Sequence, residues 1–268
     1  MNQFVKSHGL GNDYFVLDQA AISFDLTPKV IELLCHRNYG VGSDGILLLV
    51  SSEKADFGLR ILNPDGSEAE KSGNGLRTFA KYLFEHGHSD KESFTIDTLG
   101  GIVTAELETN NGNVPFVTVE MGNAIFQSNL IPVAGEDREV VQEEITVGDE
   151  KLKITALSVG NPHCVVFVDQ LREEQIRKLG PLLETHELFP NRINVQFAKP
   201  LSRDKVEILI WERGAGYTLA SGSSSCAVAS ACVKNGFTDG SVTVSMPGGE
   251  LDINIREDWS IKMRGAVE

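Results

Sequence analysis

The chain carries the same serine–glycine turn twice, each time just ahead of an expected helix. Ser72 opens "SGNG" and Ser221 opens "SGSS", 149 residues further on. Two more glycine turns repeat at nearly the same spacing, so the register holds over about 90 positions. These turns are Gly11-Asn12 with Gly160-Asn161, at an offset of 149, and Gly100-Gly101 with Gly248-Gly249, at 148. A shared offset predicts an internal duplication, and two copies predict two similar domains rather than a solenoid.

Short β-branched and apolar runs surround both turns and predict strands. In the first half they read "YFVLD", "GILLLV", "FGLRILN", "SFTID" and "GIVTAEL", and in the second "HCVVFVD", "INVQFA", "VEILIWE", "VTVSM" and "LDINI". Helices are expected over 74–86, ending at Gly87, and over 223–234, where small apolar residues indicate a buried helix. The fold expected is α+β, with two pseudo-symmetric domains, 1–119 and 120–268, each wrapping strands around a central helix. Residues 119–122 are the expected link.

Bulk composition narrows the class of function. The 268 residues carry a net charge of −14, which disfavours nucleic acid and anionic membrane surfaces as partners. No apolar run reaches the ~20 residues of a membrane span, and the N-terminal stretch lacks the apolar core of a signal peptide. Four cysteines without metal-binding spacing predict buried, reduced thiols and no metal site. We therefore expect a cytoplasmic protein.

The head of a helix presents unpaired N–H groups and partial positive charge, so it binds carboxylates readily. Two such heads facing one another would hold one anionic group from both sides, and Arg213 would suit a second carboxylate. A plainer interpretation is that Ser72 and Ser221 are only N-caps, a role that serine fills well. The glycine-rich stretches match neither a dinucleotide-binding fingerprint nor a P-loop.

Five segments, in order and along nearly the whole chain, give this sequence a family resemblance. They are "HGLGNDYFVLD", "NPDGSEAEKSGNGLR", "SVGNPHCVVFVD", "LGPLLETHELFPNRINVQF" and "WERGAGYTLASGSSSCAVA". Together they resemble the diaminopimelate epimerase family. The resemblance implies inversion of one α-carbon, between LL- and meso-diaminopimelate, for lysine and cell-wall synthesis. It implies no pyridoxal phosphate, no metal and no other cofactor, a small amino acid as partner, and it leaves a homodimer open.

Family chemistry uses two cysteines, one at each helix head, as base and acid on opposite faces of the carbon. Both positions are serine in this chain, at Ser72 and Ser221. Three interpretations follow. The chain is an inactive or strongly impaired double Cys-to-Ser form of an epimerase. Or it is a natural relative, an isomerase, racemase or dehydratase for another amino acid. Or it is a non-catalytic amino-acid-binding protein. Tyr217, at a position that is usually polar in the family, supports the last two interpretations.

The resemblance also assigns site residues. Ser72, Ser221, His163 and Glu212 occupy or adjoin the acid–base positions, although His163 would also suit a strand end bonded to its neighbours. Cys226 and Cys232 are expected to pack rather than react. The expected substrate contacts are Asn12, Asn63, Asn161, Asn194, Glu212 and Arg213 through side chains, and Gly73, Asn74, Gly222 and Ser223 through backbone donors.

Overall fold

The structure of the protein is a computed structural model that describes residues 4–268, and it divides into two compact units. Unit 1 holds the chain up to Glu120 together with Arg264–Glu268, and unit 2 holds Met121–Met263. Strands and helices are mixed in both units, so the predicted α+β class is confirmed. The last five residues therefore lie with the first half of the chain.

Unit 1 is a mixed sheet in the order β1-β2-β3-β4-β6-β7-β8. The β2–β3 and β4–β6 pairs are parallel and the other pairs antiparallel. Helix α2 packs on β1, β2 and β7. The elements are β1 (Val5–Gly9), β2 (Asn12–Asp18), α1 (Pro28–Cys35), β3 (Ile46–Val50), β4 (Phe57–Leu62), β5 (Glu68–Ala69), α2 (Gly73–Glu85), β6 (Ser93–Thr98), β7 (Gly101–Asn110) and β8 (Asn113–Asn123).

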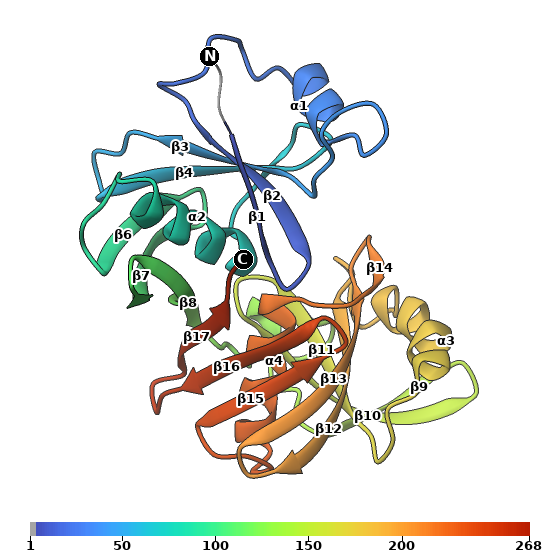
Figure 1. The fold of residues 1–268 in the computed structure, drawn as a ribbon. Coiled ribbons are helices and arrows are strands. Elements are labelled where there is room, and N and C mark those ends of the chain that lie inside the picture. The colour runs from blue at the N-terminus through green and yellow to red at the C-terminus, as the bar shows by residue number, and fades with distance from the viewer. Residues whose placement is uncertain (1–3) are drawn as a thin grey trace. The chain divides into compact units, whose positions relative to one another are not determined.

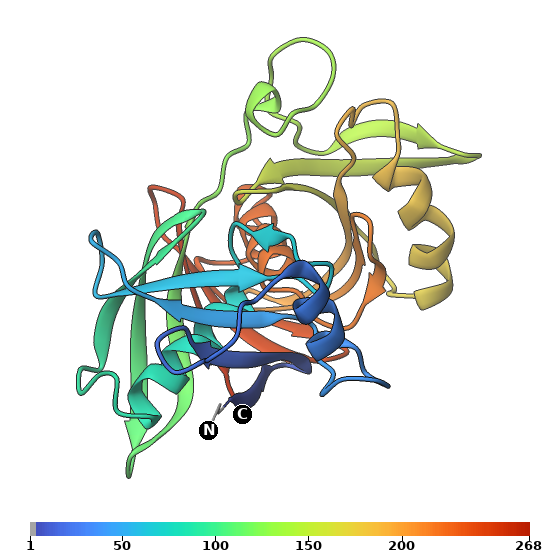
Figure 2. The same ribbon diagram turned by 90° about the horizontal axis from the view of Figure 1, so that it is seen from above.

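Unit 2 repeats this plan. Its strand order is β9-β10-β11-β12-β13-β15-β16, with β11–β12 and β13–β15 parallel. Strands curve around α4, which lies among them in both views (Figure 1, Figure 2). The elements are η1 (Ser128–Leu130), β9 (Glu143–Val147), β10 (Glu150–Ser158), β11 (Pro162–Phe167), α3 (Glu173–Glu184), β12 (Asn194–Ser202), β13 (Lys205–Glu212), β14 (Gly216–Thr218), α4 (Gly222–Lys234), β15 (Ser241–Met246), β16 (Gly249–Ile255) and β17 (Ser260–Ala266).

The duplicated turns mark equivalent places in the two units. Gly11 and Gly160 lie in the turns of the β1–β2 and β10–β11 hairpins, both at positive φ, +83° and +101°. Such angles favour glycine because it has no Cβ to clash. Each hairpin is followed by the same sequence of elements, and α2 and α4 hold the same position in it. The pseudo-symmetry read from the spacing of the turns is therefore present in the structure.

Both central helices are buried as their sequences predict. Leu76, Phe79 and Leu83 of α2 are fully buried, whereas Phe84 is only half-buried. Ten residues of α4 are buried, in keeping with its small apolar side chains. Gly75 must stay small, since a Cβ there would lie 3.0 Å from the Leu47 side chain and 3.2 Å from Ser72. This contact brings the first turn of α2 close to β3.

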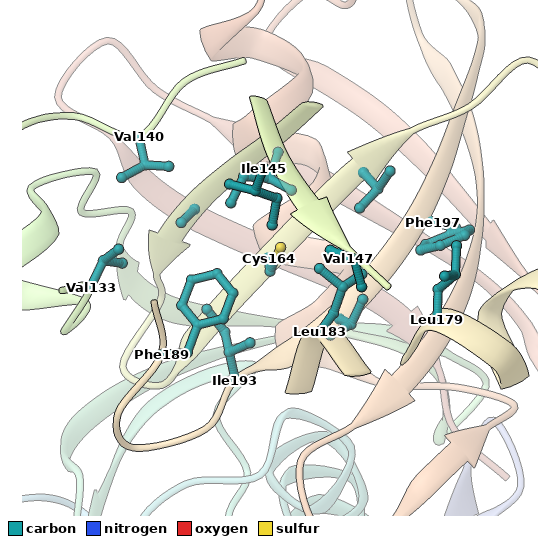
Figure 3. Close-up of a cluster of buried hydrophobic side chains, with 14 of the residues drawn as sticks. Val133, Val140, Ile145, Val147, Cys164, Leu179, Leu183, Phe189, Ile193 and Phe197 are labelled. Atoms are coloured by element: carbon teal, nitrogen blue, oxygen red, sulfur yellow. The ribbon is translucent and has the colours of Figure 1, made fainter. Parts of the chain in front are cut away.

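A hydrophobic core of unit 2 lies between its sheet and α3 (Figure 3). Val147 of β9, Phe197 of β12, and Leu179 and Leu183 of α3 belong to it, with exposures of 1% or less. Gly180 of α3 packs against Trp211, and a Cβ at Gly180 would lie 2.7 Å from the indole. The close approach of α3 thus fixes the end of β13, next to the residues expected to bind substrate.

The boundary between the two units falls after Glu120, within the link expected at residues 119–122, which is the end of β8. Two features were not anticipated. Helices α1 and α3 were not predicted, since α1 has only eight residues and α3 contains Pro181, which weakens a helical pattern. The C-terminus is tied to unit 1, where His8 and Glu268 exchange backbone hydrogen bonds of 2.7 and 3.0 Å. Among the described helices, none is long and apolar enough to cross a membrane.

Candidate active site

Ser72 caps the head of α2. Its extended backbone ends the preceding loop, and its Oγ accepts a hydrogen bond of 3.0 Å from the Gly75 N–H. The Tyr14 hydroxyl, from the middle of β2, lies 3.0 Å from the same oxygen. The capping role considered from the sequence is therefore present, and it coexists with a second hydroxyl partner that the sequence did not indicate.

Asn12 and Asn74 lie together beside this helix head. Asn74 Nδ2 donates to Asn12 Oδ1 at 3.4 Å, and Asn12 Nδ2 donates to Asp44 at 2.9 Å. Asn74 also accepts a hydrogen bond of 2.9 Å from the buried guanidinium of Arg77, which donates to the Gly73 carbonyl as well. Arg77 thus places a positive charge on the first turn of α2, where it adds to the attraction of the helix end for an anion.

An ion-pair cluster holds the turn that carries Asn12. Arg37 bridges Asp13 and Asp44 at 2.7 and 2.6 Å, and Lys6 contacts Asp13 at 3.0 Å. Burial acts to raise the pKa of Asp13, but the hydrogen bonds and charges of Arg37 and Lys6 outweigh it and lower that pKa to about 2. The cluster therefore stays ionised at neutral pH and positions the turn.

Asn63 lies further along unit 1, in the turn after β4. Its side chain donates to the Ser67 hydroxyl at 2.9 Å, so its recorded partner belongs to the same turn. Where Asn63 stands relative to the helix head is not fixed by this bond, and its substrate contact stays a prediction.

Ser221 caps the head of α4 in the same way. Its Oγ accepts from the Ser224 N–H at 3.4 Å and lies 3.5 Å from the Ser223 hydroxyl. Burial raises the pKa of Glu212, at the end of β13, above its usual range, and the Ser221 hydroxyl opposes that shift.

His163 is fully buried at the start of β11. Its Nε2 donates to Asn161 Oδ1 at 2.9 Å, and Gln196 donates to its Nδ1 at 3.0 Å, so the ring is neutral with the proton on Nε2. Burial lowers the pKa of His163 to about 3. Asn161 in turn donates to Ser223 at 3.4 Å. The network joins three predicted site residues, and within it His163 is bonded to its neighbours.

The Arg213 turn is anchored from two sides. Asn194 Oδ1 accepts a hydrogen bond of 3.0 Å from the Arg213 N–H, and Glu184 accepts from Gly214 N–H at 3.0 Å and from Trp211 at 2.8 Å. The guanidinium itself is exposed and donates to the Asn191 carbonyl at 3.1 Å. A fixed backbone with an exposed guanidinium suits the capture of a carboxylate. Sequence reasoning missed Glu184, which lies far from this turn along the chain.

All four cysteines are free and buried. Burial raises the pKa of Cys164, and it raises that of Cys232 to about 12. These two thiols are therefore protonated at neutral pH and unsuited to take a proton. Cys226 is also fully buried within α4, as expected for a packing residue. Within residues 4–268, no group of three His, Cys, Asp or Glu side chains is arranged to hold a metal ion.

The fold resembles that of several solved structures, among them an epimerase and an isomerase. A hydroxyproline epimerase from Agrobacterium vitis aligns over the whole chain and 88% of its own length, with a TM-score of 0.72 and 15% identity. A methylitaconate-delta-isomerase aligns over the whole chain and 93% of its own, with a TM-score of 0.69 and 11% identity. At such identities these likenesses establish the fold alone.

Sequence comparison assigns the chain to a family. The model of the diaminopimelate epimerase family matches residues 4–127 and 155–268. "Diaminopimelate epimerase 2" of a Nostoc species is 51% identical and covers 99% of this chain and 92% of its own. The diaminopimelate epimerase of Heliobacterium modesticaldum is 43% identical, with coverages of 96% and 92%. The chain belongs to the diaminopimelate epimerase family, and its scaffold is that of isomerases that work without pyridoxal phosphate.

Proposed function

We propose that this chain binds diaminopimelate and inverts it slowly or not at all. Relatives that are 40–51% identical along nearly the whole chain are named for that reaction, which supports diaminopimelate as the substrate and a place in lysine biosynthesis. The observation that supports slow or absent inversion is chemical. Both positions that would transfer protons hold serine hydroxyls, Ser72 and Ser221, and each hydroxyl is engaged as a helix cap.

Binding needs no thiol. Backbone N–H groups at Gly73, Asn74, Gly222 and Ser223 open the two helices, and the free N–H groups of a first turn attract a carboxylate. Arg213 offers an exposed guanidinium on a fixed backbone for the second carboxylate. Serine is uncharged at neutral pH, so it does not repel an anion. We therefore expect both stereoisomers to bind.

Inversion needs a base on one face of the carbon and an acid on the other. An unactivated hydroxyl is a far weaker base than a thiolate. Burial raises the pKa of Glu212, which favours its protonated form and makes it a poor base for activating Ser221. Slow proton transfer is therefore the expected behaviour.

The alternative of a natural relative with another substrate rested on Tyr217. The Tyr217 ring packs against the core of unit 2, and the Arg177 guanidinium stacks on it at 4.3 Å. Packing against α3 thus accounts for an aromatic residue there without a different substrate. Tyr217 does not favour a second function.

Calorimetric titration with LL- and meso-diaminopimelate tests the proposal. Both isomers should bind, and each should raise the melting temperature of the chain by mass action. Arg213→Ala should remove most of that rise, because the distal carboxylate loses its partner. Cys232→Ala, which changes packing inside α4, should lower the starting melting temperature but keep the rise. A folded sample that binds neither isomer would refute the substrate assignment.

A further inference from the structure

We propose that Tyr14 is a positioning residue that works through Ser72, so that the proton transfer remaining at the head of α2 passes along a Tyr14–Ser72 relay. The inference rests on the proposed binding of diaminopimelate and concerns how this one helix head handles a proton. Tyr14 belongs to β2 and Ser72 precedes α2, and both lie in unit 1. The two hydroxyl oxygens are 3.0 Å apart, a normal hydrogen-bond distance.

The tyrosine ring is held firmly. Tyr14 is 7% exposed, and its ring edge lies against Gly45, where an added Cβ would come within 3.1 Å of Cε1. Backbone pairing with Ser7 on β1 fixes it from the other side. Since α2 packs on β2, the phenol and the serine meet where the helix contacts the sheet of unit 1. Their contact is therefore built into the core of the unit rather than formed by a loose side chain.

The cap decides what the Ser72 hydroxyl can do. A serine oxygen has two lone pairs and one proton, and the Gly75 N–H occupies one lone pair. Tyr14 takes one of the two that remain. If the phenol donates, Ser72 presents its proton toward a ligand, and if the phenol accepts, Ser72 presents a lone pair. The direction of this single bond sets whether Ser72 behaves as an acid or as a base.

In the relay the negative charge lies on the Tyr14 phenolate, which is more stable than a charge on the serine oxygen. When Ser72 takes the α-proton, the Cα–H bond breaks, its electron pair stays on the substrate carbon, and a new O–H bond forms on Ser72. The former serine proton passes to a Tyr14 phenolate and makes a phenol. In reverse, the phenol proton replaces the one that Ser72 gives up. A phenol ionises near pH ~10, whereas water, and by analogy an aliphatic hydroxyl, ionises near ~16.

Charged and titratable groups lie on each element packed against Tyr14. They are Lys6 and His8 on β1, Asp44 just ahead of β3, Arg77, Lys81, Tyr82 and Glu85 on α2, and Asp13 and Asp18 on β2 itself. Arg77 is fully buried near the start of α2, and a buried cation favours an anion nearby. Any test by pH must therefore compare variants at each pH, so that the titration of these neighbours cancels.

The test is exchange of the α-hydrogen of diaminopimelate in heavy water, followed by NMR from pH 7 to 9.5 with binding measured in parallel. The full chain should exchange slowly, with a rate that rises with pH as the phenolate fraction grows. Tyr14→Phe should flatten that rise and lower the rate at pH 9 at least tenfold while diaminopimelate still binds. Tyr82→Phe, which removes a phenol on the outer part of α2, should match the parent.

The same substitution of Tyr14 in a variant that carries cysteine at position 72 distinguishes a relay from a purely structural role of Tyr14. A thiol at position 72 ionises by itself, so in Ser72→Cys the further change Tyr14→Phe should alter exchange less than about threefold. Equal rates in the parent and Tyr14→Phe, or no exchange by the parent above the buffer rate, would overturn the relay. An equally large loss in the cysteine background would do the same. If the unmodified chain did not bind diaminopimelate at all, the proposed function would be refuted instead.

Discussion

Ser72 and Ser221 each satisfy a backbone N–H that the start of a helix leaves unpaired, at Gly75 and at Ser224. Each serine oxygen also lies near a second hydroxyl group, that of Tyr14 for Ser72 and that of Ser223 for Ser221. The serines are thus well placed to keep both helix heads formed. Their hydroxyl groups remain poor bases, so good capping does not restore proton transfer.

Side-chain partners were the least predictable part of the site. The bond between Tyr14 and Ser72 joins positions 58 residues apart, and the bonds from Glu184 to Trp211 and Gly214 join positions 27 and 30 apart. A helix or strand pattern reports which face a residue occupies, not which distant side chain it meets. The turns themselves were predictable, because glycine and serine mark them locally.

His163 predicts a specific acid sensitivity. Burial lowers its pKa to about 3, whereas the unfolded chain takes up that proton near pH 6.5. Between these values the unfolded state binds more protons, so the free energy of unfolding should fall by up to ~1.4 kcal/mol per pH unit as pH falls from 6.5. The stabilisation is complete above pH 6.5 and is lost progressively toward pH 3.

Urea unfolding at pH 7, 6 and 5 measures this effect above the range in which ordinary carboxylates titrate. His163→Gln should lose most of the slope, and His88→Gln, on the surface of unit 1, should keep it. Identical free energies of unfolding for the parent chain at pH 7 and pH 5 would contradict the buried neutral histidine.

At the scale of elements, α2 and α4 were predicted within one residue of their observed ends, because a cap and a glycine-rich turn bracket each of them. The strands read from β-branched runs are present as well. The short helix α1 and the proline-containing α3 were missed. Their stability comes from packing, as in the contact between Gly180 and Trp211, and packing is not visible in a local pattern.

The caps predict a stability cost for alanine. Ser72→Ala and Ser221→Ala should each lower the free energy of unfolding by about 1 kcal/mol, because one N–H at each helix head loses its acceptor. Ser51→Ala, at an exposed position outside any helix, should change it by less than about 0.5 kcal/mol. Urea titrations of the three variants measure the difference, and unchanged stability in both cap variants would show that neither hydroxyl supports its helix.

The whole molecule is one plan used twice. Each unit has a glycine-turned hairpin, a parallel strand pair, a central helix capped by serine and a closing hairpin, in the same order along the chain. The offset of 149 residues predicted this plan before any strand was placed. It did not predict that Arg264–Glu268 would lie with unit 1. A sequence repeat reveals which elements are equivalent, whereas the unit in which the C-terminal residues lie depends on tertiary packing.

The most direct test of the account is the double variant Ser72→Cys with Ser221→Cys, assayed for interconversion of LL- and meso-diaminopimelate. Two thiols supply the base and the acid that inversion requires, so this variant should turn over at rates typical of enzymes, ~1–1000 per second. Each single variant should stay far below it, because one face of the carbon still lacks its thiol. A double cysteine variant that binds diaminopimelate but stays inert would contradict the account, as would a serine chain that inverts it at those rates.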